Sequence, residues 1–524
     1  MRHTLARFRH RGRVATLTIL ASLVALAVVA RATAQAGPDV AALDAYIAKA
    51  RADWDVPGMA VAVVKDGQVV LAKGYGVREL GGTGPVDDQT LFAIASNSKA
   101  FTSAALAILV REGKLGWDDR VVDHLPWFQL YDPYVTSDVR IRDLLSHRTG
   151  FTAYSGDLVW YGTTYSREEV VRRARYLKPV APFRASYGYS NVMFAAAGLV
   201  VEQASGQRWE DFVRARIFDP LGMTRTLASV DALAKTTNVA TPHGLSEGAL
   251  RAFPWVNWEG SGPAASVLSS VADMATWIRL QLGRGSVDDV TLFSDAESDQ
   301  MWTPHASFTV SRAASQRTPS THFRGYGLGW SLSDYRGRKI VEHGGAYDGM
   351  YSRVALVPEE NLGLVVLTNS MTSISSALSM RILDAYLGGE PRDWSQEYLE
   401  RYRKSEADKV ERIAAIERTR IEGTHPSFPL AAYAGTYGGD LYGDVTVSLE
   451  DGRLVLRMLP NPDLVADLSH FHHDTFEIRW RRPFPWFGKG WAQFIMNTSG
   501  EIVEMTLDVP NDDFWFWEPE FKRR

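Results

Sequence analysis

The sequence predicts an α+β fold: an antiparallel sheet flanked by helices and interrupted by a large helical insertion, followed by a small all-β barrel or sandwich. Three patterns predict it. Strand patterns open the chain and return after residue 323, helical periodicity dominates residues 115–282, and short strands recur at regular spacing from about residue 430. With 524 residues, 45% of them hydrophobic, the chain is long enough for two or three domains.

The first 36 residues have the pattern of an export signal. Five arginines among the first 13 residues precede an apolar stretch over residues 14–30, and Ala34-Gln35-Ala36 offers a small-residue cleavage site. An uncleaved membrane anchor is the alternative interpretation of the apolar stretch. We expect cleavage, and therefore a periplasmic or secreted protein with no membrane span once the signal peptide is removed.

Charge and cysteine content narrow the function classes. The signal contains six arginines and no acidic residue, so its removal takes the formal charge from −4 to −10. A mildly acidic exported chain without a basic stripe is not expected to bind nucleic acid, and its partners should be small molecules or peptides. The absence of cysteine excludes disulfides, thiolate nucleophiles and cysteine-built metal sites. We expect no cofactor, and a homo-oligomer is compatible with the sequence.

The first part of the chain has an α/β pattern, in which a helix and a β-hairpin precede a buried helix. Apolar residues at helical spacing predict a helix over residues 39–54. Residues 59–64 and 68–73, joined by Asp66-Gly67, predict a β-hairpin. A Gly/Pro loop then leads into an apolar helix that begins at Ser96 and whose side chains predict burial on nearly every side.

The helical insertion and the second half of the sheet follow. Helical periodicity is best over residues 141–145, 167–177, 190–204, 209–218 and 270–282. Strand patterns return at residues 327–332, 338–343, 351–357 and 363–368, before a helix over residues 374–387. The sheet is therefore expected to be built from both ends of a domain spanning residues 37–390.

A charged segment separates this domain from the C-terminal one. Residues 394–420 lack turn residues and predict an exposed connecting helix, within a linker over residues 391–425. Residues 426–524 predict a small all-β domain, with strands at residues 433–437, 445–449, 453–458, 475–479, 493–497 and 502–507.

The helix after the Gly/Pro loop carries a Ser-x-x-Lys pair. Residues three apart lie on one helix face, so Ser96 and Lys99 can bring a hydroxyl and an amine together. Desolvation lowers the pKa of a buried lysine, which then can accept a proton from serine. The alternative is an N-cap serine followed by a solvated lysine.

Two further motifs give the pair a context. Ser96-Asn97-Ser98-Lys99, Tyr189-Ser190-Asn191 and His343-Gly344-Gly345 resemble, in order and spacing, the three active-site motifs of the serine β-lactamase and penicillin-binding protein superfamily, in its class C-like subgroup. The resemblance covers about residues 40–390 and implies a β-lactamase/transpeptidase-like fold. The all-β tail is similar to a lipocalin-like domain often fused to such hydrolases.

The resemblance implies a role for each motif. Ser96 would form an acyl-enzyme while Lys99 and Tyr189 relay its proton; an ammonium at Lys99 would favour the tyrosine phenolate, and which of the two is the general base stays open. Asn191 would hydrogen-bond a substrate amide. His343, at the end of a strand, and Gly345 would form one wall of the cleft, and the backbone N–H groups of Ser96 and Ala346 an oxyanion hole.

One departure bears on the substrate. Many β-lactamases carry a lysine where this chain has His343, and a neutral histidine attracts an antibiotic carboxylate less. We therefore expect weak or no β-lactamase activity. The resemblance favours a serine hydrolase acting on a small amide, most suitably a D-residue peptide, of D-aminopeptidase or DD-carboxypeptidase type. The alternatives are a carboxylesterase and, in another class, a non-catalytic binding protein for cell-wall peptides.

Two other groups of residues are candidates for binding. Asp157, Trp160 and Tyr161 precede the Tyr189 motif and are placed to meet an apolar or cationic part of a substrate at the rim of the cleft. His470, His472 and His473 suggest a metal site, but alternation along a strand would divide them between two faces. We therefore predict no metal there.

Overall fold

The computed structural model describes residues 38–389 and 392–524. The predicted signal peptide, residues 1–36, lies outside the described residues. Ala45–Arg524 form one structural unit. Within the described ranges, none of the helices combines the length and apolar character that crossing a membrane requires.

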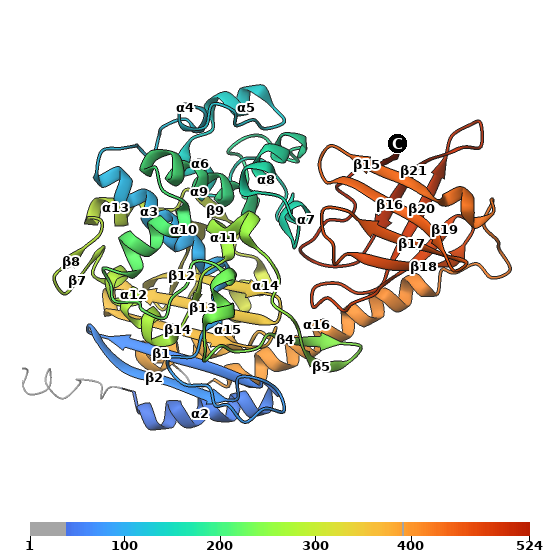
Figure 1. Cartoon of the computed structure of the whole chain (residues 1–524). Helices are drawn as coiled ribbons and strands as arrows, with labels where there is room; N and C mark the ends of the chain where they lie inside the picture. The colour runs from blue at the N-terminus through green and yellow to red at the C-terminus, as the bar shows by residue number, and fades with distance from the viewer. Residues whose placement is uncertain (1–37, 390–391) are drawn as a thin grey trace, which may run out of the picture. The chain divides into compact units, whose positions relative to one another are not determined.

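The predicted antiparallel sheet is confirmed, with eight strands in the order β2-β1-β14-β13-β12-β11-β10-β9 (Figure 1). Its two halves come from the two ends of the domain, because β1 pairs with β14, which is far along the chain. Nearly every residue of these two central strands is buried, as expected of strands covered on both faces. The strand bounds are β1 Gly58–Lys65, β2 Gln68–Gly76, β9 Ala306–Phe308, β10 Arg324–Tyr326, β11 Ser331–Tyr335, β12 Arg338–Tyr347, β13 Met350–Val357 and β14 Leu362–Thr368.

Helices from the predicted insertion and from the end of the domain pack on this sheet. Helix α12 packs against β1 and β14, and α15 against β13 and β14. The long helix α16 lies in the segment 394–420 for which a connecting helix was predicted, and its first two residues are buried. The helix bounds are α2 Val40–Asp53, α3 Ser98–Arg111, α4 Val121–His124, α5 Pro133–Asp138, α6 Ile141–Leu145, α7 Asp157–Trp160, α8 Arg167–Arg173, α9 Asn191–Ser205, α10 Trp209–Val213, α11 Gly262–Ala265, α12 Val271–Leu282, α13 Asp295–Met301, α14 Arg312–Arg317, α15 Ile374–Leu387 and α16 Trp394–Glu417.

Two predictions on the sheet need correction. Residues 327–332 are not one strand: β10 ends at Tyr326 and β11 begins at Ser331, with Gly329 between them at a φ of +79°. A Cβ at Gly329 would lie 2.9 Å from the carbonyl oxygen of Lys99, so the turn passes close to helix α3. In addition, β12 continues to Tyr347, and His343 therefore lies within a strand and not at its end.

The C-terminal domain is a closed eight-stranded barrel. The predicted strand ranges did not include β18, although a strand was assumed around His470, and did not include β22. Polar residues and a bulge between His470 and His472 interrupt the apolar alternation of β18, and β22 has only three residues. The barrel strands are β15 Gly435–Gly439, β16 Gly443–Glu450, β17 Arg453–Met458, β18 Val465–His472, β19 Thr475–Trp480, β20 Gly490–Met496, β21 Ile502–Asp508 and β22 Phe521–Arg523.

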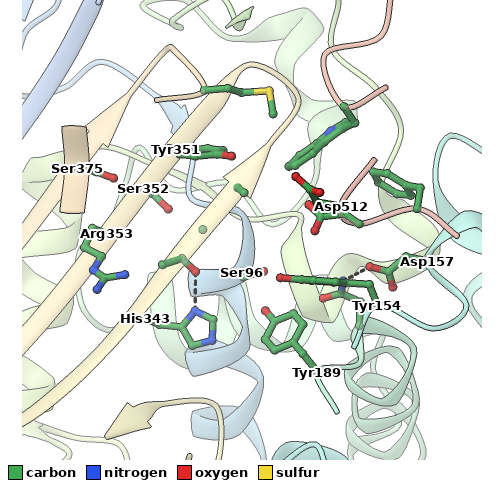
Figure 2. Close-up of a pocket in the computed structure, with 18 of the residues that line it drawn as sticks. Ser96, Tyr154, Asp157, Tyr189, His343, Tyr351, Ser352, Arg353, Ser375 and Asp512 are labelled. Carbon is green, nitrogen blue, oxygen red and sulfur yellow. Dashed lines mark hydrogen bonds between the residues drawn. The ribbon is translucent and has the colours of Figure 1, made fainter. Parts of the chain in front are cut away.

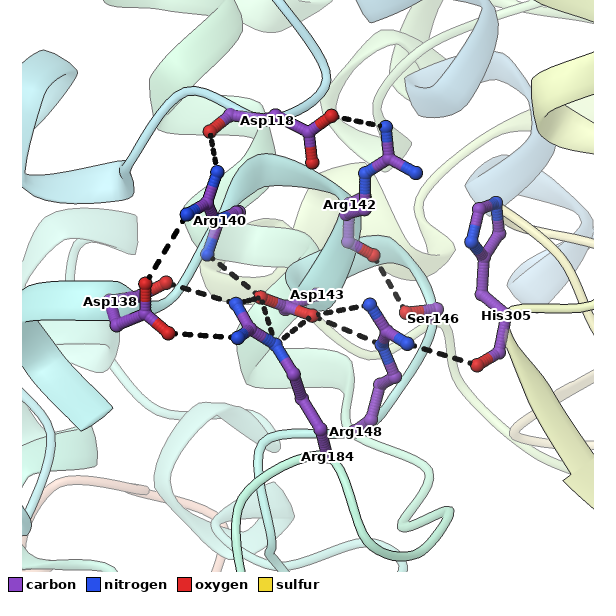
Figure 3. Close-up of polar contacts among 9 residues, drawn as sticks. All are labelled: Asp118, Asp138, Arg140, Arg142, Asp143, Ser146, Arg148, Arg184 and His305. Carbon is purple, nitrogen blue, oxygen red and sulfur yellow. Dashed lines mark hydrogen bonds and ion pairs between the residues drawn. The ribbon is translucent and has the colours of Figure 1, made fainter.

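A buried carboxylate holds together the loops that lead to the site. Asp143 is fully buried and accepts hydrogen bonds from Arg148 at 3.0 Å and from Arg184 at 2.6 Å (Figure 3). Arg184 also reaches Asp138, at 2.8 Å. Charge-assisted pairs of this kind are strong when they are buried. They join the segment around residue 147 to the loop that begins after Arg184 and carries Tyr189.

Candidate active site

Ser96 lies in a tight turn at the start of a buried helix. The 3₁₀ turn Ala95–Asn97 (η1) runs directly into α3, and Ala95 has a φ of +47°, which is uncommon for a residue with a Cβ. Twelve of the fourteen residues of α3 are buried, among them Lys99, as its apolar sequence predicted. The turn thus presents Ser96 at the edge of the domain core.

The Lys99 amine faces Ser96 from inside the core. Its Nζ lies 3.0 Å from Ser96 Oγ, 2.6 Å from Asn191 Oδ1 and 3.1 Å from the carbonyl oxygen of Ala264. Burial lowers the pKa of Lys99 to about 7, and the negative charge of Asp157 opposes that shift. A lysine in this state is largely neutral in mildly alkaline solution and can accept a proton.

The Tyr189 ring covers the amine from the other side. Its centroid lies 4.6 Å from Lys99 Nζ. Burial raises the pKa of the Tyr189 phenol well above its ordinary value, and the contact with Ser96 opposes this only in part. The sequence argument left open whether Lys99 or Tyr189 is the base. Burial disfavours the charged form of both groups, the tyrosine phenolate and the lysine ammonium.

Asn191 does not present a free amide to the cavity. Its Oδ1 accepts from Lys99, and its Nδ2 donates to Asp157 Oδ2 at 2.6 Å. The expected hydrogen bond from Asn191 to a substrate amide therefore competes with contacts that the protein already makes. Asn191 begins helix α9, for which Ser190 is the N-cap, accepting from the N–H of Met193 at 3.4 Å.

Strand β12 forms one wall beside the Ser96 turn. A Cβ on Gly345 would lie 2.1 Å from the carbonyl oxygen of Ile94, so only glycine permits this approach. Ala346 follows in the same strand and pairs with Tyr351 of β13. His343 is buried; its Nδ1 lies 2.6 Å from its neighbour's carbonyl oxygen and its Nε2 lies 2.8 Å from Tyr326 Oη. Burial lowers the pKa of His343 to about 3, so the imidazole is neutral.

These residues surround a cavity of about 540 Å³ (Figure 2). It is lined by Ser96, Tyr189, Asn191, His343, Gly345 and Ala346, while Lys99 lies beneath it. The C-terminal domain adds the side chains Trp486, Asp512, Asp513 and Phe514 to the lining. Figure 2 shows Arg353 and Asp512 on opposite sides of Ser96.

Comparison with known proteins agrees with this geometry. The family model described as Beta-lactamase matches residues 43–388. The chain belongs to the beta-lactamase family. A second model, described as a domain of unknown function (DUF3471), matches residues 419–524.

Relatives of this beta-lactamase family protein include two named hydrolases and penicillin-binding proteins. It is 34% identical to unguisins hydrolase ungD' of Aspergillus campestris, over 77% of this chain and 76% of the relative. It is 31% identical to penicillin-binding protein 4 of Amycolatopsis lactamdurans, over 62% of this chain and 84% of the relative. The protein is a serine hydrolase of this family.

Solved structures show the same fold. The octameric penicillin-binding protein homologue from Pyrococcus abyssi superposes with a TM-score of 0.61 at 23% identity, covering 93% of this chain and all of that one. The comparison supports the mixed fold with its antiparallel sheet and small barrel.

The site of this family member contains residues that the sequence did not single out. His147 has a φ of +58°, and its ring lies tilted against the Tyr189 ring with the two centroids 4.4 Å apart. Its Nδ1 accepts from the N–H of Ser190 at 3.0 Å. The hydroxyl of Tyr326 lies within hydrogen-bonding distance of His343 Nε2, at 2.8 Å. The segment Leu144-Leu145-Ser146-His147-Arg148-Thr149-Gly150 also resembles the family and is the signal that could have found His147; nothing local marks Tyr326 or the barrel side chains.

The structure changes the role expected for Asp157, Trp160 and Tyr161 at the rim of the cleft. Trp160 and Tyr161 are almost fully buried, at 2% and 0% exposure, and Asp157 bonds to Trp160 Nε1 at 2.9 Å. They are core residues, although Asp157 and Trp160 touch the cavity from below its rim. In the described part of the chain, no group of three or more histidine and acidic side chains is placed to hold a metal ion.

Proposed function

We propose that this serine hydrolase cleaves a small amide through an acyl-enzyme on Ser96, with Lys99 as the general base. The observation that carries the proposal is the 3.0 Å approach of Lys99 Nζ to Ser96 Oγ, in a lysine whose pKa burial lowers to about 7. A general base works best with a pKa near the working pH.

We propose one sequence of steps for these residues. Ser96 Oγ bonds to the carbonyl carbon while its proton passes to Lys99 Nζ, and the N–H groups of Ser96 and Ala346 are proposed to bind the resulting oxyanion. Tyr189, neutral because of its raised pKa, donates its proton to the leaving nitrogen and is reprotonated from Lys99. Water then attacks the acyl-enzyme and releases the acid and free Ser96.

We propose a D-residue peptide as the substrate class. The neutral His343 gives no cation for the carboxylate of a β-lactam, which supports the expectation of weak or no β-lactamase activity. Asp512 and Asp513 on one wall suit a peptide amino group, as in a D-aminopeptidase. Arg353 on the other wall is paired with Glu342 at 3.0 Å, so the carboxylate of a DD-carboxypeptidase substrate would have to share it. An ester of similar shape is the alternative. We also propose export of the protein to the periplasm or beyond, and leave self-association to measurement.

The test uses residues 37–524, wild type and Ser96→Ala. A fluorophosphonate probe should add once to the wild type and not to the variant, by intact mass. Unmodified wild type that is shown to be folded would contradict the proposal and favour the binding-protein alternative. The substrate class is then assigned by measuring, side by side, the turnover of D-aminoacyl amides, D-alanyl-D-alanine peptides, simple esters and nitrocefin. Turnover of nitrocefin at ordinary enzymatic efficiency would contradict the expectation of weak or no β-lactamase activity.

A further inference from the structure

A chain of short contacts connects a buried carboxylate to the nucleophile. Asp157 Oδ2 accepts from Asn191 Nδ2 at 2.6 Å, Asn191 Oδ1 accepts from Lys99 Nζ at 2.6 Å, and Lys99 Nζ lies 3.0 Å from Ser96 Oγ. We propose that Asp157 is a positioning residue that, through Asn191, directs the lone pair of Lys99 toward Ser96. The inference rests on the proposed function, in which Lys99 is the base.

The first step concerns the direction of the Asn191 amide. An amide has one accepting and one donating end. An ionised carboxylate only accepts, so Asp157 requires the NH₂ end of Asn191 on its own side. The oxygen end then necessarily faces Lys99. Without Asp157, the Asn191 side chain keeps its contact with Lys99, and a neutral amine can either donate to the oxygen end or accept from the NH₂ end.

The second step concerns the amine. A neutral lysine has two N–H bonds and one lone pair. Asn191 Oδ1 and the carbonyl oxygen of Ala264 accept the two N–H bonds, at 2.6 and 3.1 Å. The remaining direction, toward Ser96 Oγ, is left for the lone pair. An Asn191 amide turned the other way would present N–H to Lys99 and compete for that lone pair.

The surroundings of Asp157 keep it in place as an acceptor. Its side chain is 2% exposed, and its other oxygen, Oδ1, accepts from Trp160 Nε1 at 2.9 Å. Both neighbours are thus donors. Burial raises the pKa of Asp157 well above its ordinary value and Asp513 adds to that shift, while the two donors and Lys99 oppose it. The preceding residue, Gly156, donates its N–H to Glu518 of the barrel at 2.7 Å.

The charge of Asp157 also acts on the titration of Lys99. The titratable groups facing the amine are Asp157, the imidazoles of His147 and His343, and the phenol of Tyr189. Both imidazoles and the phenol are neutral near pH 7, since burial lowers the pKa of the histidines and raises that of the tyrosine. Asp157 is therefore the charged neighbour that holds the pKa of Lys99 up.

The test measures how fast a fluorophosphonate modifies Ser96 between pH 5 and 9, in the wild type and in Asp157→Asn. In that step a bond forms from Ser96 Oγ to phosphorus, fluoride leaves and the proton goes to Lys99. The introduced amide can satisfy only one of the two donors around it, and so favours the reversed Asn191 orientation. We expect the high-pH rate to fall about tenfold to a hundredfold, as for a misdirected base. The fall in rate toward low pH, the acid limb of the profile, should move to lower pH, because removing the negative charge of Asp157 lowers the pKa of Lys99.

The control is Asp348→Asn. Asp348 is also a fully buried carboxylate, accepting from Trp258 Nε1 at 3.0 Å and from Tyr161 Oη at 2.7 Å, but it has no contact with Asn191 or Lys99. It should keep the wild-type rate and acid limb. If Asp157→Asn does not fold, Asp157→Ala replaces it. We expect the same lower rate at high pH and the same shift of the acid limb to lower pH.

The outcomes separate the two proposals. Unmodified wild type refutes the proposed function, and the role of Asp157 with it. Labelled wild type with the same rate and acid limb in Asp157→Asn refutes only the role of Asp157. A slower variant whose acid limb stays in place, or an equal loss in Asp348→Asn, would show a merely structural carboxylate and also overturn the inference.

Discussion

Adding one methyl group at Gly345 tests how closely the Ser96 turn and strand β12 must approach. The new Cβ would lie 2.1 Å from the carbonyl oxygen of Ile94 and 2.3 Å from Ser352 Oγ. Ordinary contact begins at 3.4 Å, so the strand and the turn must separate by about 1 Å. The first clash is with backbone, which cannot rotate away as a side chain can.

The expected loss is larger in activity than in stability. Overpacking of this size costs about 1–3 kcal/mol of unfolding free energy. A displacement of about 1 Å between reacting groups costs about a hundredfold in rate. Gly345→Ala should therefore remain folded and react with a fluorophosphonate about a hundredfold more slowly than the wild type.

The adjacent glycine gives a matched control. A Cβ on Gly344 would meet only Arg353 Nη1 at 3.3 Å and the carbonyl oxygen of Ser352 at 3.8 Å, and an arginine side chain can yield by a few tenths of an ångström. Gly344→Ala should therefore lose far less rate. The assay is the labelling rate by intact mass, together with thermal unfolding. A Gly345→Ala protein that labels within threefold of the wild type would refute the reasoning.

Three further predictions follow from the same site and its support. Because Lys99 must be neutral to accept a proton and its pKa is about 7, labelling should slow about tenfold per pH unit below pH 7 and level off above; a flat profile from pH 5 to 9 would contradict this. Tyr189→Phe should impair turnover of an amide, whose nitrogen needs a proton, more than labelling by the fluorophosphonate, whose fluoride does not; equal losses would argue against the phenol as acid. Asp143→Asn removes the carboxylate from Arg148 and one of the two carboxylates from Arg184, and should lower the unfolding free energy by about 3 kcal/mol in urea denaturation. An unchanged midpoint would show that the contacts in Figure 3 contribute little to stability.

Local pattern accounts for the parts of the site that the sequence could predict. Ser96 and Lys99 are three residues apart across the 3₁₀ turn that runs into helix α3, and this spacing brings the hydroxyl and the amine together as predicted, although the helix begins at Ser98 and not at Ser96. Likewise, hydrophobic runs predicted β1 and β14, and the connecting helix followed from its charge pattern.

The remaining features depend on contacts between distant segments. Gly344 and Gly345 suggested the end of a strand, but pairing with Arg353 and Ser352 of β13 carries β12 through them. The partner of Asn191 comes from 34 residues earlier in the chain, which no local period encodes. The sequence also left open whether Lys99 or Tyr189 is the base; burial, which lowers the pKa of the lysine and raises that of the tyrosine, depends on the tertiary packing of both.

The two walls of the cavity come from parts of the chain that differ in how closely they are packed. The wall that carries Ser96 tolerates little change, since helix, turn and strand are interlocked there. The opposite wall consists of loop residues between barrel strands, such as Trp486 and Asp512, whose replacement leaves the barrel ladder intact. Exchanging short loops of the barrel should therefore change which side chains face the cavity opposite Ser96, while the turn, helix and strand around Ser96 stay as they are.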